Sequence, residues 1–175
     1  MMRVIWRLPG PQRSRMFIWL AAHGRILTNA CRVNRHMGDD PSCPRCSSSE
    51  EDLDHLLRSC PTSRFIWNQV GGPARISSFF EIPLIEWLES NASNSSPQAH
   101  SDWALEFSIT CWWIGKWRNN VVCVRSAEMP NNVYECLCKQ FISTKRAVDK
   151  YSIVRHGQGL GSWEGVIRGA RSNHG

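Results

Sequence analysis

Apolar residues recur at helical spacing along most of this chain, so the sequence predicts a series of helices rather than a sheet. One amphipathic helix is expected over residues 12–23, with Gly24 as its C-terminal stop. A second should run from the N-cap Thr28 to about Met37. Residues 1–10 are the exception, because they are expected to form a short strand-like or extended entry before a Pro-Gly-Pro turn.

Proline and glycine residues set the limits of the next helices. A short helix is expected from Leu53 to about Ser59, because the residue before Pro61 is pushed out of the helical region. The next helix should open with Pro61 in its first turn and end at Gly71-Gly72. Another short helix is expected over residues 83–90.

The second half of the chain begins with a polar, low-complexity run at residues 91–101, which predicts a linker. Residues 1–90 would then form one small domain, and two amphipathic helices within residues 102–154 would form a helical hairpin connector. Residues 155–175 are rich in glycine and aperiodic, which predicts a disordered tail. The predicted fold class is therefore mainly α.

Composition allows a packed core, since 42% of the residues are hydrophobic and nine are Trp. The net charge of +6 is concentrated at the two ends, and the first 38 residues hold seven Arg and no acidic residue. This balance permits a polyanionic partner. The short apolar run Met16–Ala22 lacks a cleavage site, and no run reaches the roughly 18–20 residues that a membrane span needs. We therefore expect an intracellular protein of the nucleus or cytoplasm, neither secreted nor membrane-bound, with reduced thiols.

The most specific chemistry lies in Cys43, Cys46, His55 and Cys60, which follow the pattern C-x2-C-x8-H-x4-C. Four such ligands fill a tetrahedral zinc site, so the sequence predicts a structural Zn²⁺ within residues 43–60. On one continuous helix, His55 and Cys60 would lie about 140° apart. They can converge only if the helix ends between them, and Pro61 supplies that break.

Two other interpretations of the cysteines are weaker. A redox C-x2-C pair normally opens a helix after a strand, and no such pattern surrounds Cys43. A catalytic zinc needs an open coordination position, which four protein ligands do not leave. No carboxylate pair or nucleophile–base pair stands out either, so we expect neither an enzyme nor a small-molecule substrate. The single cysteines, Cys31, Cys111 and Cys123, are expected to be buried hydrophobic residues.

With these residues identified, the chain resembles the zinc-binding domain of plant non-LTR (LINE-type) retroelement reverse transcriptases. The resemblance rests on the runs Ile5–Pro9, Arg15–Thr28, Cys43–Cys46 and Glu51–Pro61. Residues 105–124 are similar to the connector that leads to a ribonuclease H domain in such polyproteins. The resemblance implies the same four zinc ligands and a place after a polymerase domain. Gly115 departs from it, because it replaces an aromatic residue and costs about 1 kcal/mol in helix propensity.

The sequence therefore predicts a non-catalytic zinc-binding module of a retroelement reverse transcriptase that assists binding of RNA or DNA. Its phosphate contacts would come from five arginines, Arg13, Arg15, Arg25, Arg32 and Arg35. The alternative is a purely structural module, in which these arginines are an ordinary solvated face and the helices dock on a reverse transcriptase polymerase domain. In that case the chain could also be a degenerate element fragment. Trp112 and Trp113 could stack on bases, although core packing is their more common use.

Overall fold

A computed structural model describes residues 2–47, 50–72, 77–93, 101–124, 130 and 132–161. These residues form helices joined by loops and no β-strand, which confirms the mainly α fold class. In chain order the elements are α1 (Met2–Arg7), α2 (Gln12–Ala22), α3 (Asn29–Asn34), the π-helical turn η1 (His55–Ser59), α4 (Pro61–Val70), the 3-10 turn η3 (Ser77–Phe80), α5 (Leu84–Ala92), α6 (Trp103–Val124) and α7 (Val133–Gly161).

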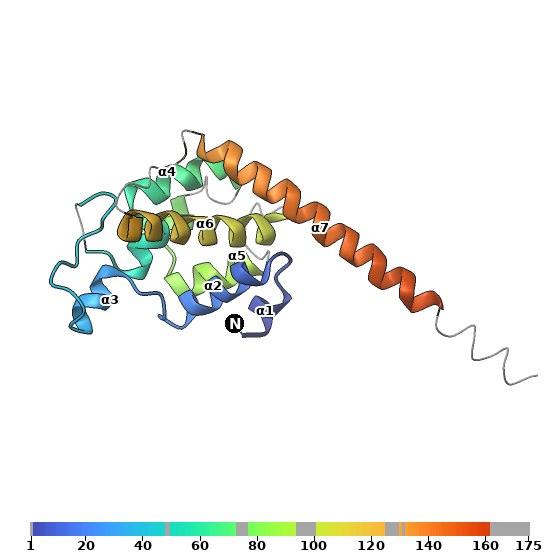
Figure 1. Ribbon diagram of the computed structural model, residues 1–175, viewed down its shortest axis with the longest axis horizontal. Coiled ribbons are helices and arrows are strands. Elements are labelled where there is room, and N and C mark those ends of the chain that lie inside the picture. Colours follow the sequence, from blue (N-terminus) through green and yellow to red (C-terminus); the bar gives the residue numbers. More distant parts are fainter. Residues whose placement is uncertain are drawn as a thin grey trace, which may run out of the picture.

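Helix α6 runs through the middle of the body (Figure 1). It packs against α2 and α5 on one side and against η1 on another, and α7 crosses both α4 and α6 near its own start. From there α7 extends away from the rest of the molecule. In the part of the chain that the structure describes, no helix is long and apolar enough to cross a membrane.

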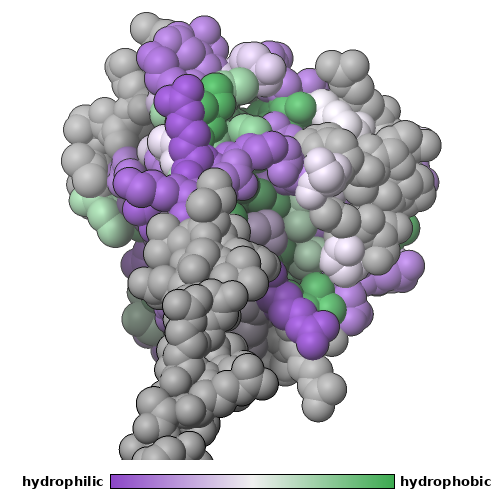
Figure 2. All heavy atoms as spheres, turned by 90° about the vertical axis from the view of Figure 1, so that its right-hand side faces the viewer, coloured by the Kyte–Doolittle hydropathy of each residue, from purple (hydrophilic) through white to green (hydrophobic). Residues whose placement is uncertain are grey.

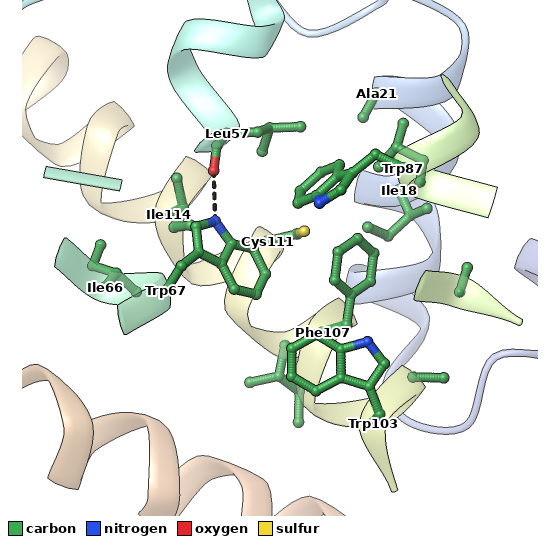
Figure 3. Packing of buried hydrophobic residues seen from close by; sticks show 14 of the residues in the cluster. Ile18, Ala21, Leu57, Ile66, Trp67, Trp87, Trp103, Phe107, Cys111 and Ile114 are labelled. Atoms are coloured by element: carbon green, nitrogen blue, oxygen red, sulfur yellow. Dashed lines mark hydrogen bonds between the residues drawn. The ribbon is translucent and has the colours of Figure 1, made fainter. Parts of the chain in front are cut away.

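The core is a cluster of aromatic rings contributed by several elements (Figure 3). Trp67 of α4 stacks on Phe107 of α6 at 5.6 Å between ring centroids and meets Trp87 of α5 edge-on at 5.7 Å. Phe79 and Trp103 complete the cluster, and all five side chains are buried. Aromatic pairs in these geometries add stabilisation beyond the area that they bury.

Hydrogen bonds fix two of the buried indole rings. The Trp67 Nε1–H donates to the Leu57 carbonyl at 2.8 Å, the bond drawn in Figure 3. The Trp103 Nε1–H donates to Asn91 Oδ1, also at 2.8 Å. A buried polar hydrogen without a partner is costly, so these bonds make the ring positions specific. They also join η1 to α4, and α5 to α6.

The prediction of an extended entry at residues 1–10 is wrong, because Met2–Arg7 form helix α1. The apolar residues of this segment have helical spacing, and the fold uses it. Ile5 and Leu8 are 1% and 3% exposed and belong to the central core, whereas Trp6 between them is 42% exposed. Burial against the body therefore selects the helix over the extended chain.

The predicted helix limits hold at some ends and fail at others. Gly24 follows α2 in the left-handed region, with a φ of 59°, and the Arg25 N–H donates back to the Leu20 carbonyl, as in a Schellman motif. Thr28 caps α3 as predicted, since its Oγ1 accepts from the Cys31 N–H. Helix α3 ends at Asn34, earlier than Met37, because His36 adopts a left-handed conformation with a φ of 55°.

The predicted division into a domain, a linker and a connector stays a prediction. Residues 94–100 of the linker lie outside the described residues, and Asn91 and Ala92 belong to α5. Helices on both sides of the linker contribute to one hydrophobic core. Helix α7 continues through Gly161, beyond the predicted start of a disordered tail, and residues 162–175 lie outside the described residues.

Candidate metal centre

The first two ligands lie in a turn whose two flanks are tied together. Asp40 Oδ1 accepts the Ser42 N–H at 2.8 Å, which orders the chain entering the turn. The Ser47 N–H donates to the Cys43 carbonyl at 2.8 Å and closes the Cys-Pro-Arg-Cys turn. The chain that follows the turn then returns beside the segment that enters it, because the Glu51 N–H donates to the Pro41 carbonyl. The segment that leads to His55 therefore starts close to the Cys turn.

The other two ligands stand at the two ends of the π-helical turn. The Cys60 N–H donates to the His55 carbonyl at 2.9 Å, the i to i+5 bond that defines this rare geometry. Cys60 itself is extended, with a φ of −60° and a ψ of 134°, and Pro61 opens α4 directly after it. The predicted helix break is therefore confirmed, and the wider π turn is a further feature that brings His55 and Cys60 together.

The carbonyl groups of this π turn have partners from outside it. Leu56 O accepts from Arg45 Nη2 and from Ser63 Oγ, each at 2.7 Å. Leu57 O accepts the Trp67 indole N–H. Because buried backbone carbonyls need hydrogen bonds, these three side chains stabilise a turn that regular helix bonding would disfavour. Sequence reasoning did not find this role, since a π turn has no recognised motif.

The four candidate ligand atoms fit a tetrahedral zinc ion. They all lie within 4.8 Å of one another, with Cys43 Sγ 3.9 Å from Cys60 Sγ and Cys46 Sγ 3.3 Å from His55 Nε2. A tetrahedron with Zn–S bonds of about 2.3 Å places its sulfur atoms about 3.8 Å apart. Cys43, His55 and Cys60 are buried and Cys46 is half-buried, so protein ligands alone surround the centre. Zinc bound here would hold the Cys turn against the π turn.

The hydrogen bond between the two buried cysteines shifts their pKa values in opposite directions. The hydrogen bond to Cys60 raises the pKa of Cys43 to about 12, and the hydrogen bond from Cys43 lowers the pKa of Cys60 to about 6. Arg45 and the backbone N–H groups of Thr62 and Ser63 also favour the Cys60 thiolate. The surroundings thus favour a thiolate at Cys60, and zinc binding must also displace the proton of Cys43, because zinc requires deprotonated sulfur ligands.

Arg45 is the cation closest in sequence to the ligands, since it lies between Cys43 and Cys46. Its Nη2 bonds to the Leu56 carbonyl, whereas its Nε and Nη1 are buried without a hydrogen-bond partner. Zn²⁺ with three thiolates and one neutral His carries a net charge of −1. A buried charge needs compensation, and the Arg45 guanidinium supplies it beside the site.

A buried ion pair connects the zinc loop to α6. Glu51 and Arg118 are 0% and 4% exposed, and Arg118 Nη2 lies 2.5 Å from Glu51 Oε2. The Asn29 N–H at the start of α3 also donates to Glu51 Oε2, and Arg118 Nη2 donates to Asn29 Oδ1. Neither Glu51 nor Arg118 was predicted as a site residue, because 67 positions separate them in the chain.

The structure does not place the five predicted nucleic-acid arginines in one patch. Arg25 and Arg32 line a common groove beside α6, and Arg35 is exposed after α3. Arg13 lies over the Trp112 ring at 4.5 Å, and Arg15 bonds to the Gly10 carbonyl. Their role in binding stays a prediction, and only Arg25 and Arg32 share a concave surface.

The remaining aromatic and thiol predictions have mixed outcomes. Trp112 and Trp113 are half-buried, and Lys116 lies over both rings. Cys111 is buried as predicted, whereas Cys31 is half-buried and Cys123 is exposed, so that expectation is wrong for Cys123. Cys123 lies near the end of α6, where little covers it.

A closed Cys3His site in a small helical body defines the class: a module with a structural zinc centre. Residues 1–67 match the family described as zinc-binding in reverse transcriptase, which confirms the resemblance found in the sequence. The chain is also 32% identical over 114 residues to an Arabidopsis thaliana protein named "putative ribonuclease H protein". That match covers 65% of this chain and 18% of the relative, so the chain spans a small part of its length. No solved structure matches the chain.

Proposed function

We propose that this zinc-binding module of a reverse-transcriptase-related protein assists nucleic-acid binding and has no catalytic activity of its own. The groove lined by Arg25 and Arg32, between the α2–α3 region and α6, is the observation that supports this proposal. Apolar side chains such as Phe17 and Ile26 form other parts of its wall. Two guanidinium groups on a concave surface suit a phosphate backbone, and apolar walls suit sugars and bases.

The zinc centre contributes to this function through structure alone. Its four ligands leave no position for water or substrate, so the metal cannot act as a Lewis acid there. The centre instead fixes the loop that follows α3. Glu51 of that loop holds both Asn29 and Arg118, and Arg118 itself lines the groove. Zinc would thereby fix the positions of the two sides of the groove relative to each other.

The structural alternative is also supported by a specific observation. The Glu51–Arg118 pair and the shared core make the zinc loop part of the support for α6. A module of this kind would present α6 and α7 to the rest of a larger protein, such as a polymerase domain. It would need no nucleic acid.

Salt-dependent binding separates the two candidates. We expect the zinc-loaded chain to bind a labelled oligonucleotide in fluorescence anisotropy, with affinity that falls steeply between about 50 and 200 mM salt. Charge reversal at Arg25 and Arg32, which line the groove, should weaken binding and flatten the salt slope. Arg146→Glu is the control for reversal of an exposed charge, because this residue is exposed on α7 and does not line the groove. No binding by the unaltered chain at low salt would leave only the structural function.

A further inference from the structure

A second basic cleft is lined by α7 and by the residues that join α1 to α2. Figure 1 shows α7 leaving the body near this junction. The end of α1 contributes Arg7 to its lining, and the first turn of α2 contributes Arg15. One face of α7 contributes polar side chains at helical spacing, namely Gln140, Ser143, Thr144 and Tyr151. Figure 2 views the molecule from this end and shows a mainly hydrophilic face with some hydrophobic residues between the hydrophilic ones.

The charge of this cleft points to an anionic ligand. Two arginines line it and no acidic residue does. Lys145, the next residue along α7 after Thr144, is paired with Asp102 and so adds no net charge. Hydroxyl and amide groups supply the other polar atoms of the lining. Arginine with neutral donors is a common setting for phosphate oxygens.

Arg15 is already held in position for such a ligand. Its Nη2 donates to the Gly10 carbonyl at 2.7 Å, and its Nε is buried without a hydrogen-bond partner. Gly10 fixes this geometry, because its φ of 108° suits glycine and a Cβ there would lie 2.6 Å from Leu105 Cδ1. A buried N–H donor without an acceptor needs an explanation, and an oxygen atom of a bound anion supplies one.

We propose that this cleft binds single-stranded nucleic acid, with a backbone phosphate at Arg7 and Arg15 and a base on the ring of Tyr151. Tyr151 is 64% exposed and lines the cleft, so its aromatic side chain borders the space that a ligand would occupy. Aromatic stacking needs an unpaired base, which favours a single strand over a duplex. The inference rests on the proposed nucleic-acid function but places the contact on different residues from the Arg25 and Arg32 groove.

The test compares variants of the full zinc-loaded chain on labelled single-stranded and duplex oligonucleotides of one sequence. Arg7→Gln should weaken single-strand binding and reduce the slope of log affinity against log salt by about 0.7. Tyr151→Ala should weaken single-strand binding at least about fivefold and leave duplex binding nearly unchanged. Both residues are exposed, so thermal melting should be unaffected. Arg146→Gln, on α7 but outside the cleft, provides the matched loss of one charge.

The outcomes separate failure of the cleft from failure of the proposed function. If the unaltered chain binds and charge reversal at Arg25 and Arg32 weakens it, while Arg7→Gln behaves like Arg146→Gln and Tyr151→Ala has no effect, the cleft is not the contact. If the unaltered chain binds no oligonucleotide at low salt, nucleic-acid binding itself is wrong, and the cleft proposal falls with it. Selective loss in the Arg7 and Tyr151 variants supports the cleft.

Discussion

At the scale of single residues, Cys60 has three structural roles. It is a candidate zinc ligand, the residue that ends η1 and the residue that precedes α4. We expect Cys60→Ser to lose zinc, because a serine hydroxyl is a poor zinc ligand at neutral pH and leaves only three protein ligands. Native mass spectrometry should show one zinc ion on the unaltered chain and none on this variant.

Cys123→Ser is the matched control for that measurement. Cys123 is exposed and is not among the four clustered ligands, so its substitution should leave one bound zinc and an unchanged helix content. A Cys60→Ser chain that retained a full equivalent of zinc with native helicity would contradict the four-ligand assignment.

Gly115 has a low helix propensity, but it is required for packing. An added Cβ would lie 2.4 Å from Phe17 Cε2 and 2.5 Å from Cζ, so the glycine lets the Phe17 ring of α2 approach the α6 backbone. Glycine at this position, where the related connectors have an aromatic residue, therefore permits a close contact between α2 and α6 and does not weaken the packing. We expect Gly115→Ala to lower the free energy of unfolding by about 1 kcal/mol, since overpacking outweighs the propensity gain.

A double-mutant cycle in chemical denaturation isolates this contact. Phe17→Leu removes the ring atoms that the new Cβ would meet, so Gly115→Ala should be neutral or stabilising in that background. Equal destabilisation in both backgrounds would show that Phe17 is not the reason for glycine at this position.

At the scale of elements, local signals predicted most helices well. Thr28, Gly24 and Pro61 act over one or two turns, and their capping or breaking effects appear where expected. The α1 helix and the π turn were missed for a physical reason. Both depend on tertiary partners: α1 on burial of Ile5 and Leu8, and η1 on side chains that bond its carbonyls.

The Glu51–Arg118 pair is the polar connection between the zinc loop and α6, and its loss should be costly. Arg118→Met leaves the Glu51 carboxylate buried at 0% exposure without its cation, which we expect to lower the free energy of unfolding by about 3–5 kcal/mol. Urea denaturation of the zinc-loaded chain measures this change.

Removal of the second charge should recover much of the loss. The double variant Glu51→Gln/Arg118→Met has no unpaired buried charge, so it should be more stable than Arg118→Met alone. Arg146→Met is the control for loss of an exposed arginine. If Arg118→Met and Arg146→Met have the same small effect, the pair does not stabilise the contact between the loop and α6.

At the scale of the whole molecule, the zinc site and the core differ in how far sequence could predict them. The four ligands lie within 18 consecutive positions, so their spacing alone was enough to predict the zinc site. Partners such as Glu51 and Arg118, or Trp67 and Phe107, come together only through the packing of several helices. No periodic pattern encodes those pairings, and the same limit left the two basic grooves unpredicted.

Zinc removal should open one part of the molecule and leave the aromatic core closed. The core rings come from α4, η3, α5 and α6, whereas the metal holds only the loop and η1. With chelator, we expect the loop to separate from η1, which would make Cys43 and Cys60, both 0% exposed while the loop is closed, accessible to alkylation. Cys111 should stay protected, since it is fully buried in α6 and burial raises its pKa well above its usual range.

Peptide mass mapping after brief alkylation measures these sites separately. Exposed Cys123 should react with and without chelator and gives the reference rate within the same chain. Intrinsic tryptophan fluorescence should change little, because the rings of Trp67, Trp87 and Trp103 stay buried. If chelation made Cys111 as reactive as Cys43, zinc would be holding the whole body together, and the metal centre would be a condition for the entire fold rather than for the loop that it closes.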